Sequence, residues 1–244
     1  MGKVVLVTGS SRGIGKATII EFAKRGYDVV INYVNCREEA EELKRKVEEE
    51  YHVQALVIQA DVSNEVDVKN MVDKIISTFG HIDCLVNNAG IAIDTIFEDK
   101  TKENFIKTLN TNLIGPFLVS KEVGKHMLET KKGSIINISS TNGIDTIYPE
   151  SLDYDASKAG VISLTKNLAL QYAPYIRVNS VAPGWVLTEM NKELDSDFIE
   201  EEESKILLNR FAEPSEIAKV IVFLASDEAS YINGEVIRVD GGWK

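Results

Sequence analysis

A tyrosine and a lysine four residues apart, in Tyr154-Asp155-Ala156-Ser157-Lys158, are the residues of this sequence best suited to proton transfer. Within a helix this spacing places both side chains on one face, with Cβ atoms about 6 Å apart. The pKa of a phenol is about 10, and a neighbouring ammonium group lowers it by stabilising the phenolate. The pair is therefore predicted to donate and accept a proton near neutral pH, although an ordinary surface pair has the same spacing.

A glycine-rich stretch near the N-terminus is the second candidate. Residues 8–15 read Thr-Gly-Ser-Ser-Arg-Gly-Ile-Gly, directly after an apolar, β-branched run and before a helix-like segment. Glycines at a strand-to-helix turn let a ligand approach the backbone, and the helix N-terminus offers free N–H groups to a pyrophosphate. The spacing is Gly-x-x-x-Gly-x-Gly and not the commoner Gly-x-Gly-x-x-Gly. A dinucleotide site is predicted here, with a purely structural loop as the alternative.

Strand and helix patterns alternate along the whole chain. Apolar runs predict strands at 3–8, 28–34, 53–59, 82–87, 134–138, 175–181 and 235–239. Helical patterns occupy 13–26, 36–51, 64–79, 101–130 with a break, 154–173, 189–209 and 214–226. This alternation predicts an α/β fold, a doubly wound parallel sheet (Rossmann fold) of about seven strands with helices on both faces. We expect residues 1–244 to form a single NAD(P)-binding domain.

The composition excludes several classes of function. A net charge of −11 disfavours nucleic acids and anionic membranes as partners. No apolar stretch has the length of a membrane span, and the N-terminus leads straight into the first strand, so we expect a cytoplasmic protein without a signal peptide. Cys36 and Cys84 do not form a Cys-x-x-Cys pair and the three histidines are scattered. Neither a metal site nor a Ser-His-Asp hydrolase is expected.

Six motifs in order carry a family resemblance: residues 8–15, Asn87-Asn88-Ala89-Gly90, Asn112, Ser139-Ser140, Tyr154-x-x-x-Lys158 and Pro183-Gly184-Trp185-Val186-Leu187-Thr188. Together they resemble the short-chain dehydrogenase/reductase family, in its branch of about 250 residues. The resemblance extends from Lys3 to the closing Asp240-Gly241-Gly242. Within that family, the residues of the glycine-rich loop and of the scaffold most resemble those of the β-ketoacyl-acyl-carrier-protein reductases.

The resemblance implies four catalytic residues. Tyr154 would exchange the proton with the substrate oxygen, and Lys158 would lower the pKa of Tyr154 and bind the nicotinamide ribose. Ser140 would hydrogen-bond the substrate oxygen, and Asn112 would hold a water that links Lys158 to solvent. Ser140 precedes Tyr154 by one residue more than the commonest family spacing, and it fits the catalytic position better than Ser139.

The implied cofactor is NADP, with NAD possible. No acidic residue stands between Val30 and Arg37 to bind both ribose hydroxyls, whereas Arg12 and Arg37 can bind a 2′-phosphate with help from Asn32. The implied cofactor-binding residues are Gly9, Ser11, Arg12, Gly13, Ile14, Gly15, Asn32, Arg37, Asp61, Val62, Asn88, Ala89, Gly90, Tyr154, Lys158, Pro183, Gly184, Val186 and Thr188.

The substrate is less defined by the sequence. Ser140, Ile147, Tyr148, Tyr154 and Trp185 are expected to contact it. A 3-oxoacyl thioester on an acyl carrier protein, a sugar or polyol, and a steroid-like ketone all remain open, as does a non-catalytic NADP-binding sensor or scaffold. Four lysines are expected to place positive charge near the cleft for an acidic carrier: Lys121, Lys125, Lys131 and Lys132.

Two further segments have a function by resemblance. Residues 188–212 are expected to form a substrate lid, although the acidic run at 195–203 is also typical of a solvated helix face. The stretches 112–128 and 156–172 are apolar over more than one stripe, so they need a second burial partner. The matching helices of the family form its main subunit contact, which implies a homotetramer.

Overall fold

Seven parallel strands form one sheet in the computed structural model, which describes residues 2–191 and 194–243. The spatial order is β3-β2-β1-β4-β5-β6-β7. The strands are β1 (Val4–Val7), β2 (Asp28–Tyr33), β3 (Ala55–Gln59), β4 (Cys84–Asn87), β5 (Gly133–Ile138), β6 (Ile176–Pro183) and β7 (Val236–Val239). The strand order reverses between β1 and β4, where doubly wound sheets bind nucleotides. The predicted fold class is confirmed.

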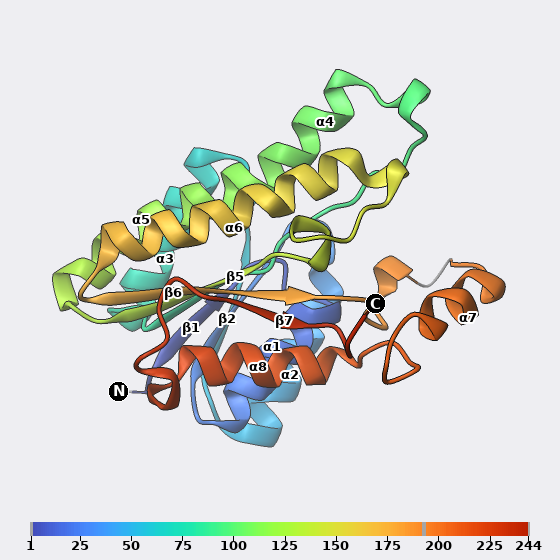
Figure 1. Ribbon diagram of the computed structural model, residues 1–244. Helices are drawn as coiled ribbons and strands as arrows, with labels where there is room; N and C mark the ends of the chain where they lie inside the picture. Colours follow the sequence, from blue (N-terminus) through green and yellow to red (C-terminus); the bar gives the residue numbers. More distant parts are fainter. Residues whose placement is uncertain (1, 192–193, 244) are drawn as a thin grey trace.

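Helices cover both faces of the sheet (Figure 1). One face carries α1 (Gly13–Lys24), α2 (Arg37–Tyr51) and α8 (Pro214–Ala225), and the other carries α3 (Glu65–Phe79), α5 (Gly115–Thr130) and α6 (Leu152–Tyr172). Each face of the sheet has its own hydrophobic core, and β1 contributes to both. Val5 and Val7 pack in the core beneath α1, α2 and α8, whereas Val4 and Leu6 pack in the core beneath α3, α5 and α6. A strand buried on both faces needs a continuous apolar run, and β1 has one.

One expected helix is broken as predicted, and another is shorter than expected. The stretch 101–130 divides into α4 (Lys102–Leu109), a π-helical turn η2 (Asn110–Ile114) and α5. Pro116 has no N–H, so the carbonyl of Asn112 lacks its α-helical partner and the helix changes its winding there. The stretch 189–209 contains only η5 (Glu189–Asn191) and α7 (Ser196–Ser204), and residues 192–193 lie outside the described residues.

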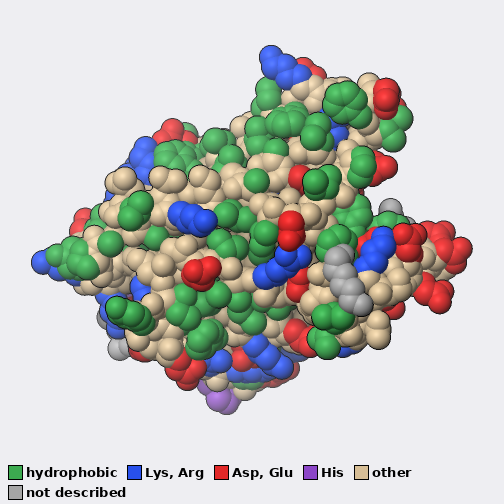
Figure 2. All heavy atoms as spheres, in the orientation of Figure 1, with side chains coloured by type: hydrophobic (Ala, Val, Ile, Leu, Met, Phe, Trp, Pro, Cys, Tyr) green, Lys and Arg blue, Asp and Glu red, His purple; other side chains and the backbone are tan. Residues whose placement is uncertain are grey.

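Four short 3₁₀ turns complete the element list: η1 (Phe97–Asp99), η3 (Thr141–Gly143), η4 (Pro149–Ser151) and η6 (Asp227–Ala229). Helix α7 lies beyond the carboxyl ends of β6 and β7, and its acidic side chains gather at one edge of the molecule (Figure 2). Within residues 2–191 and 194–243, no helix is both long and apolar enough to cross a membrane. The same residues contain no cluster of potential metal ligands.

Candidate active site

The predicted catalytic residues lie close together at the carboxyl ends of the parallel strands. Ser140 follows β5, and Gly90 follows β4. A Cβ atom on Gly90 would lie 3.4 Å from Asn112 Oδ1 and 3.7 Å from Lys158 Nζ. Gly143 is equally close to α6, since a Cβ there would lie 2.6 Å from the Lys158 carbonyl carbon. Three loops and α6 therefore converge on one point, and small residues permit the approach.

Tyr154 and Ser140 interact directly. Burial raises the pKa of Tyr154 to about 12, while a hydrogen bond from the Ser140 side chain lowers it and the carboxylates of Asp155 and Asp94 raise it. The direction is opposite to the one that the sequence predicted, because desolvation outweighs the stabilisation of the phenolate. Tyr154 is therefore protonated at neutral pH, as a proton donor must be.

Lys158 is 4% exposed and points between Tyr154 and the end of β5. Its Nζ donates to the carbonyl oxygen of Ile138 at 2.8 Å and lies 5.4 Å from the centre of the Tyr154 ring. Burial lowers the pKa of Lys158 to about 8, so the ammonium form prevails at neutral pH but is costly to keep there. An ammonium group has three hydrogens, which leaves donors available to a bound ligand.

Asn112 is buried in the π-helical turn, and its side chain is fully engaged. Oδ1 accepts from the Ile91 N–H at 2.8 Å, while Nδ2 donates to the Ile91 carbonyl at 2.8 Å and to Ser157 Oγ at 3.1 Å. These bonds fix the loop after β4 against α6. Both polar atoms of the carboxamide are thus bonded within the protein, and Pro116 leaves the main-chain carbonyl of Asn112 without its α-helical donor.

Two side chains that the sequence did not single out hold the reacting groups in place. Asn142 Nδ2 donates to Asp155 Oδ1 at 2.7 Å, and Ser140 Oγ donates to Asn142 Oδ1 at 3.2 Å. A carboxylate only accepts, so it orients the amide with its oxygen toward Ser140. In the sequence, the position of Asp155 directly after Tyr154 could have indicated that its carboxylate lies close to the reacting groups.

A buried ion pair fixes the start of α6. Lys100 Nζ lies 2.8 Å from Asp153 Oδ1, and Thr108 Oγ1 donates to Asp153 Oδ2 at 2.6 Å. Asp153 is fully buried; burial alone would raise its pKa, but the bonds from Lys100 and Thr108 hold the pKa below its usual value. This arrangement ties α4 and the loop before it to the residue that precedes Tyr154.

The glycine-rich loop fits a pyrophosphate. Gly9 and Gly13 have φ values of +59° and +56°, and a Cβ on Gly15 would lie 2.6 Å from Asn88 Nδ2. Helix α1 begins at Gly13 with no side-chain cap and no acidic residue in its first turn, so its N–H groups and positive dipole end stay open to an anion. Ser11, Gly13, Ile14 and Gly15 would hold the phosphates of a nicotinamide dinucleotide.

Two asparagines predicted to touch the cofactor also support this loop. Asn32 is buried, accepts from the Gly9 N–H at 3.0 Å and donates to the Ala60 carbonyl at 3.0 Å. Asn88 Nδ2 donates to the carbonyls of Thr8 and Gly9, each at 2.9 Å. The contact of Asn32 with a 2′-phosphate does not fit this geometry, because its polar atoms are already bonded within the protein.

Arg12 and Arg37 are both exposed, at the N-cap of α1 and the first residue of α2. Both helices begin at the same edge of the sheet, where β1 and β2 end. Asp61 accepts from the backbone and side chain of Ser63, while Val62 is buried. These residues surround the predicted adenosine end.

The loop after β6 approaches the glycine-rich loop. A Cβ on Gly13 would lie 3.5 Å from Thr188 Cγ2, and one on Gly184 would lie 2.8 Å from Asp240 Cβ. Val186 is buried and bridges to Ala212. Of the remaining predicted cofactor residues, Ala89 and Thr188 contact the glycine-rich loop, Gly90 lies near Asn112 and Lys158, and Pro183, Gly184 and Val186 lie at the end of β6 or just after it.

The predicted substrate residues divide into two groups. Tyr148 and Trp185 pack edge to face, with ring centres 5.5 Å apart, and both donate to the carboxylate of Glu202 in α7. Ile147 has 79% of its surface exposed and takes no part in this cluster. Glu202 was not singled out by the sequence, because it stands in a run of acidic residues whose other members face solvent or are half-buried.

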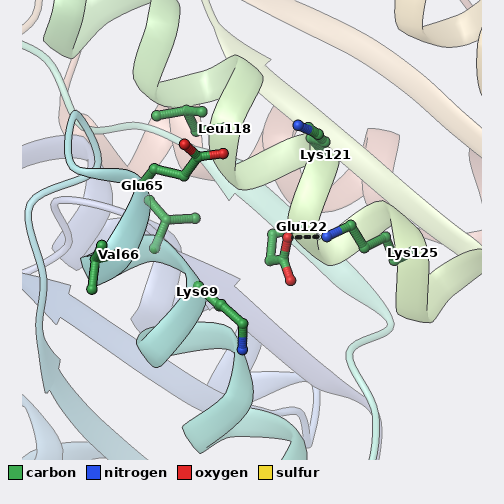
Figure 3. A pocket seen from close by; sticks show the side chains of 8 residues that line it. Glu65, Val66, Lys69, Leu118, Lys121, Glu122 and Lys125 are labelled. Carbon is green, nitrogen blue, oxygen red and sulfur yellow. Dashed lines mark hydrogen bonds and ion pairs between the residues drawn. The ribbon is translucent and has the colours of Figure 1, made fainter.

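The expected positive charge near the cleft is largely absent. Lys131 and Lys132 precede β5 whereas Ser140 follows it. The two lysines and the serine therefore lie at opposite ends of this strand, about 20 Å apart. Lys121 and Lys125 line a surface pocket between α3 and α5 with Glu65, Val66, Lys69, Leu118 and Glu122 (Figure 3). None of the predicted catalytic residues lines that pocket.

Comparisons with known proteins agree over the whole chain. The family model described as "Enoyl-(Acyl carrier protein) reductase" matches residues 9–244. The "3-oxoacyl-[acyl-carrier-protein] reductase FabG" of Staphylococcus epidermidis is 40% identical over 243 residues, 99% of each chain. Its namesake from Thermotoga maritima is 42% identical over 248 residues, 99% of this chain and 97% of the relative.

Solved structures give the same fold. Acetoin dehydrogenase YohF from Salmonella typhimurium superposes with a TM-score of 0.90 at 34% identity, covering 100% of this chain and 96% of that one. Levodione reductase superposes with a TM-score of 0.90 at 38% identity, covering 98% and 96%. The chain, whose predicted catalytic residues lie together after β4, after β5 and in α6, belongs to the short-chain dehydrogenase/reductase family and is an NAD(P)-dependent oxidoreductase acting between secondary alcohols and ketones.

Proposed function

We propose that this protein is an NADPH-dependent 3-oxoacyl-[acyl-carrier-protein] reductase. The observation that carries the proposal is the full-length identity of 40–42% to proteins of that name. The phenol of Tyr154, whose pKa burial raises to about 12, is protonated at neutral pH and can donate a proton to a ketone oxygen.

Tyr154 and Ser140 act on the substrate oxygen. When bound, the reduced nicotinamide supplies the hydride to the carbonyl carbon. Tyr154 donates its phenolic proton to the carbonyl oxygen, and Ser140 turns its hydroxyl hydrogen from Asn142 Oδ1 to the same atom. Both bonds strengthen as negative charge develops on the oxygen, so they stabilise the transition state more than the bound ketone.

Lys158 and Asn112 return the proton. The Lys158 ammonium, with donors beyond its bond to Ile138, binds the ribose and stabilises the phenolate left on Tyr154. The main-chain carbonyl of Asn112 holds the water through which a proton from solvent reaches Lys158 and then Tyr154. With a pKa of about 8, Lys158 can give up and regain a proton near neutral pH.

Selection of NADPH rests on Arg12 and Arg37. Both guanidinium groups stand exposed at the ends of β1 and β2, and no acidic residue between Val30 and Arg37 would repel a 2′-phosphate. A guanidinium fork binds phosphate with charge-assisted hydrogen bonds, which a ribose hydroxyl cannot match.

A homotetramer is the expected assembly. Large apolar side chains remain exposed on α5 and α6 although both helices already cover the sheet: Phe117, Leu128, Leu152 and Leu170. Contacts between subunits would bury these side chains, as they do in the family.

A small diketone is the second candidate substrate. The observation that favours it is the likeness to the structures of acetoin dehydrogenase and levodione reductase, combined with the acidic surface of α7. Carboxylates at the entrance repel an acidic carrier protein, whereas a neutral diketone is unaffected.

The test compares NADPH oxidation with acetoacetyl-acyl-carrier protein, acetoacetyl-coenzyme A, acetoin, 2,3-butanedione, a keto sugar and a steroid ketone. We expect the highest kcat/KM with the carrier-bound substrate. In Tyr154→Phe, turnover should fall by about 10²- to 10⁴-fold with NADPH binding retained, because only the proton is removed. Higher kcat/KM for a diketone selects the second candidate, and a fall of less than tenfold in Tyr154→Phe contradicts the role of Tyr154.

A further inference from the structure

Glu202 is buried although it belongs to the acidic run of α7. Its side chain is 2% exposed, whereas Glu200 and Glu201 of the same helix face solvent. Oε2 accepts from Trp185 Nε1 at 2.9 Å and from the hydroxyl of Tyr148, and Oε1 accepts from Lys205 Nζ at 2.6 Å. Burial alone would raise the pKa of Glu202, but these three donors hold the pKa below its usual value.

The two aromatic partners of Glu202 belong to a larger cluster. Trp185 stacks on Phe211 at 5.3 Å and meets Tyr148 and Phe198 edge to face at 5.5 and 5.7 Å. We name these four side chains the aromatic wall. It joins the loop before α6, the loop after β6, helix α7 and the segment that follows it.

The wall stands next to the reacting groups. The Tyr148 N–H donates to Asp155 Oδ2 at 3.4 Å, and Asp155 follows Tyr154 in α6. Trp185 comes two residues after the end of β6, whose neighbour β5 leads into Ser140. Tyr148 and Trp185 therefore lie on segments that adjoin those of Tyr154 and Ser140.

Glu202 accepts hydrogen bonds from both polar hydrogens of the aromatic wall. An indole has one N–H, and in Trp185 it is shared between Glu202 and the Tyr148 oxygen, 3.2 Å away. A phenol has one O–H, and in Tyr148 it is donated to Glu202. With both hydrogens taken, Tyr148 and Trp185 present ring surface to a substrate and no donor.

We propose that Glu202 is a positioning residue that determines substrate specificity, by binding the Tyr148 hydroxyl and the Trp185 N–H so that the aromatic wall accepts alkyl groups and rejects hydroxylated ones. This inference rests on the proposed ketone reduction and selects 3-oxoacyl and alkyl ketones over sugars and polyols. A hydroxyl against an apolar surface finds no partner, and pockets of this kind discriminate by about ten- to a hundredfold.

The experiment compares an acetoacetyl thioester with its 4-hydroxy derivative in the wild type, Glu202→Ala, Glu202→Gln and the control Glu200→Gln. We expect the wild type, Glu202→Gln and Glu200→Gln to favour the alkyl substrate in kcat/KM by at least about tenfold, since a glutamine oxygen can still accept both hydrogens. In Glu202→Ala the freed hydrogens serve the hydroxyl, and the preference should fall to about threefold or less.

A spectroscopic arm reports the contact without substrate. The chain has two tryptophans, so a Trp243→Phe background leaves Trp185 as the sole emitter. Glu202→Ala should shift Trp185 emission to the red, and Glu202→Gln should not. Tyr148→Phe, which keeps the ring and has no hydroxyl to free, should keep the alkyl preference.

The outcomes separate the two proposals. A wild type that reduces neither ketone overturns the proposed function. If both proteins are active but Glu202→Ala keeps the tenfold alkyl preference and the wild-type Trp185 emission, this inference alone is overturned. If Glu202→Ala does not fold, a Tyr148→Phe protein that loses the alkyl preference overturns the inference equally, because its ring presents no donor and the Trp185 N–H keeps Glu202 as acceptor.

Discussion

Replacing Lys158 with methionine should stabilise the protein at pH 7 while removing its activity. The ammonium group is almost fully buried, and burial lowers its pKa from 10.5 to about 8. Each pKa unit corresponds to about 1.4 kcal/mol, so keeping this charge in the fold costs about 3 kcal/mol at neutral pH. Methionine retains the apolar stem but loses the bond to the Ile138 carbonyl, worth about 1 kcal/mol. The expected net gain is about 2 kcal/mol.

The gain should depend on pH in a defined way. The folded state releases the Lys158 proton at a lower pH than the unfolded state, so between pH 8 and 10.5 the unfolded state binds more protons. Stability of the wild type therefore rises with pH across that window relative to Lys158→Met. The advantage of the variant should shrink above pH 8 and vanish near about pH 10.

Urea denaturation of both proteins without cofactor, at equal concentration and at several pH values, measures the difference. Lys158→Arg serves as a control because it keeps the buried charge and should gain no stability. A Lys158→Met protein that is less stable than the wild type at pH 7, or a difference that stays constant from pH 7 to 10, would refute the assignment of a costly buried charge.

Three further outcomes are expected. Arg37→Ala should raise the KM for NADPH about tenfold and leave that for NADH unchanged, with the exposed Arg45→Ala as control; equal effects on both cofactors would rule out contact with the 2′-phosphate. Light scattering should give about four times the 27.1 kDa chain mass, and Phe117→Glu should reduce it; a monodisperse wild-type monomer contradicts the assembly. Glu200→Gln combined with Glu203→Gln should improve kcat/KM for carrier-bound substrates over neutral ketones, as added salt should; a ratio insensitive to both means that these carboxylates only face solvent.

The parallel sheet follows from local patterns in the sequence. A strand buried on both faces needs a continuous apolar run, and residues 4–7, Val-Val-Leu-Val, provide one. The glycine-rich loop is also a local property, because positive φ at Gly9 and Gly13 requires residues without a Cβ. Ser140, Tyr154 and Lys158 were assigned by resemblance, and the structure brings them together at one edge of the sheet.

Only the tertiary structure decided what several polar side chains do. The residues around Asn32 and Asn88 in the sequence do not reveal whether each side chain contacts a ligand or supports a loop. Both side chains bond to the backbone of Gly9, which is distant from them in sequence. Glu202 cannot be told from Glu201 by its neighbours along the chain. Its burial depends on Tyr148 and Trp185, which arrive from other segments.

The pKa of Tyr154 is the clearest case. The sequence places an ammonium four residues away, which alone would lower the pKa, but desolvation by the surrounding elements raises it to about 12. Residue types and spacing therefore determined which groups could react. The three-dimensional packing determined which state they hold, because desolvation and hydrogen bonding depend on contacts between segments that no local pattern encodes.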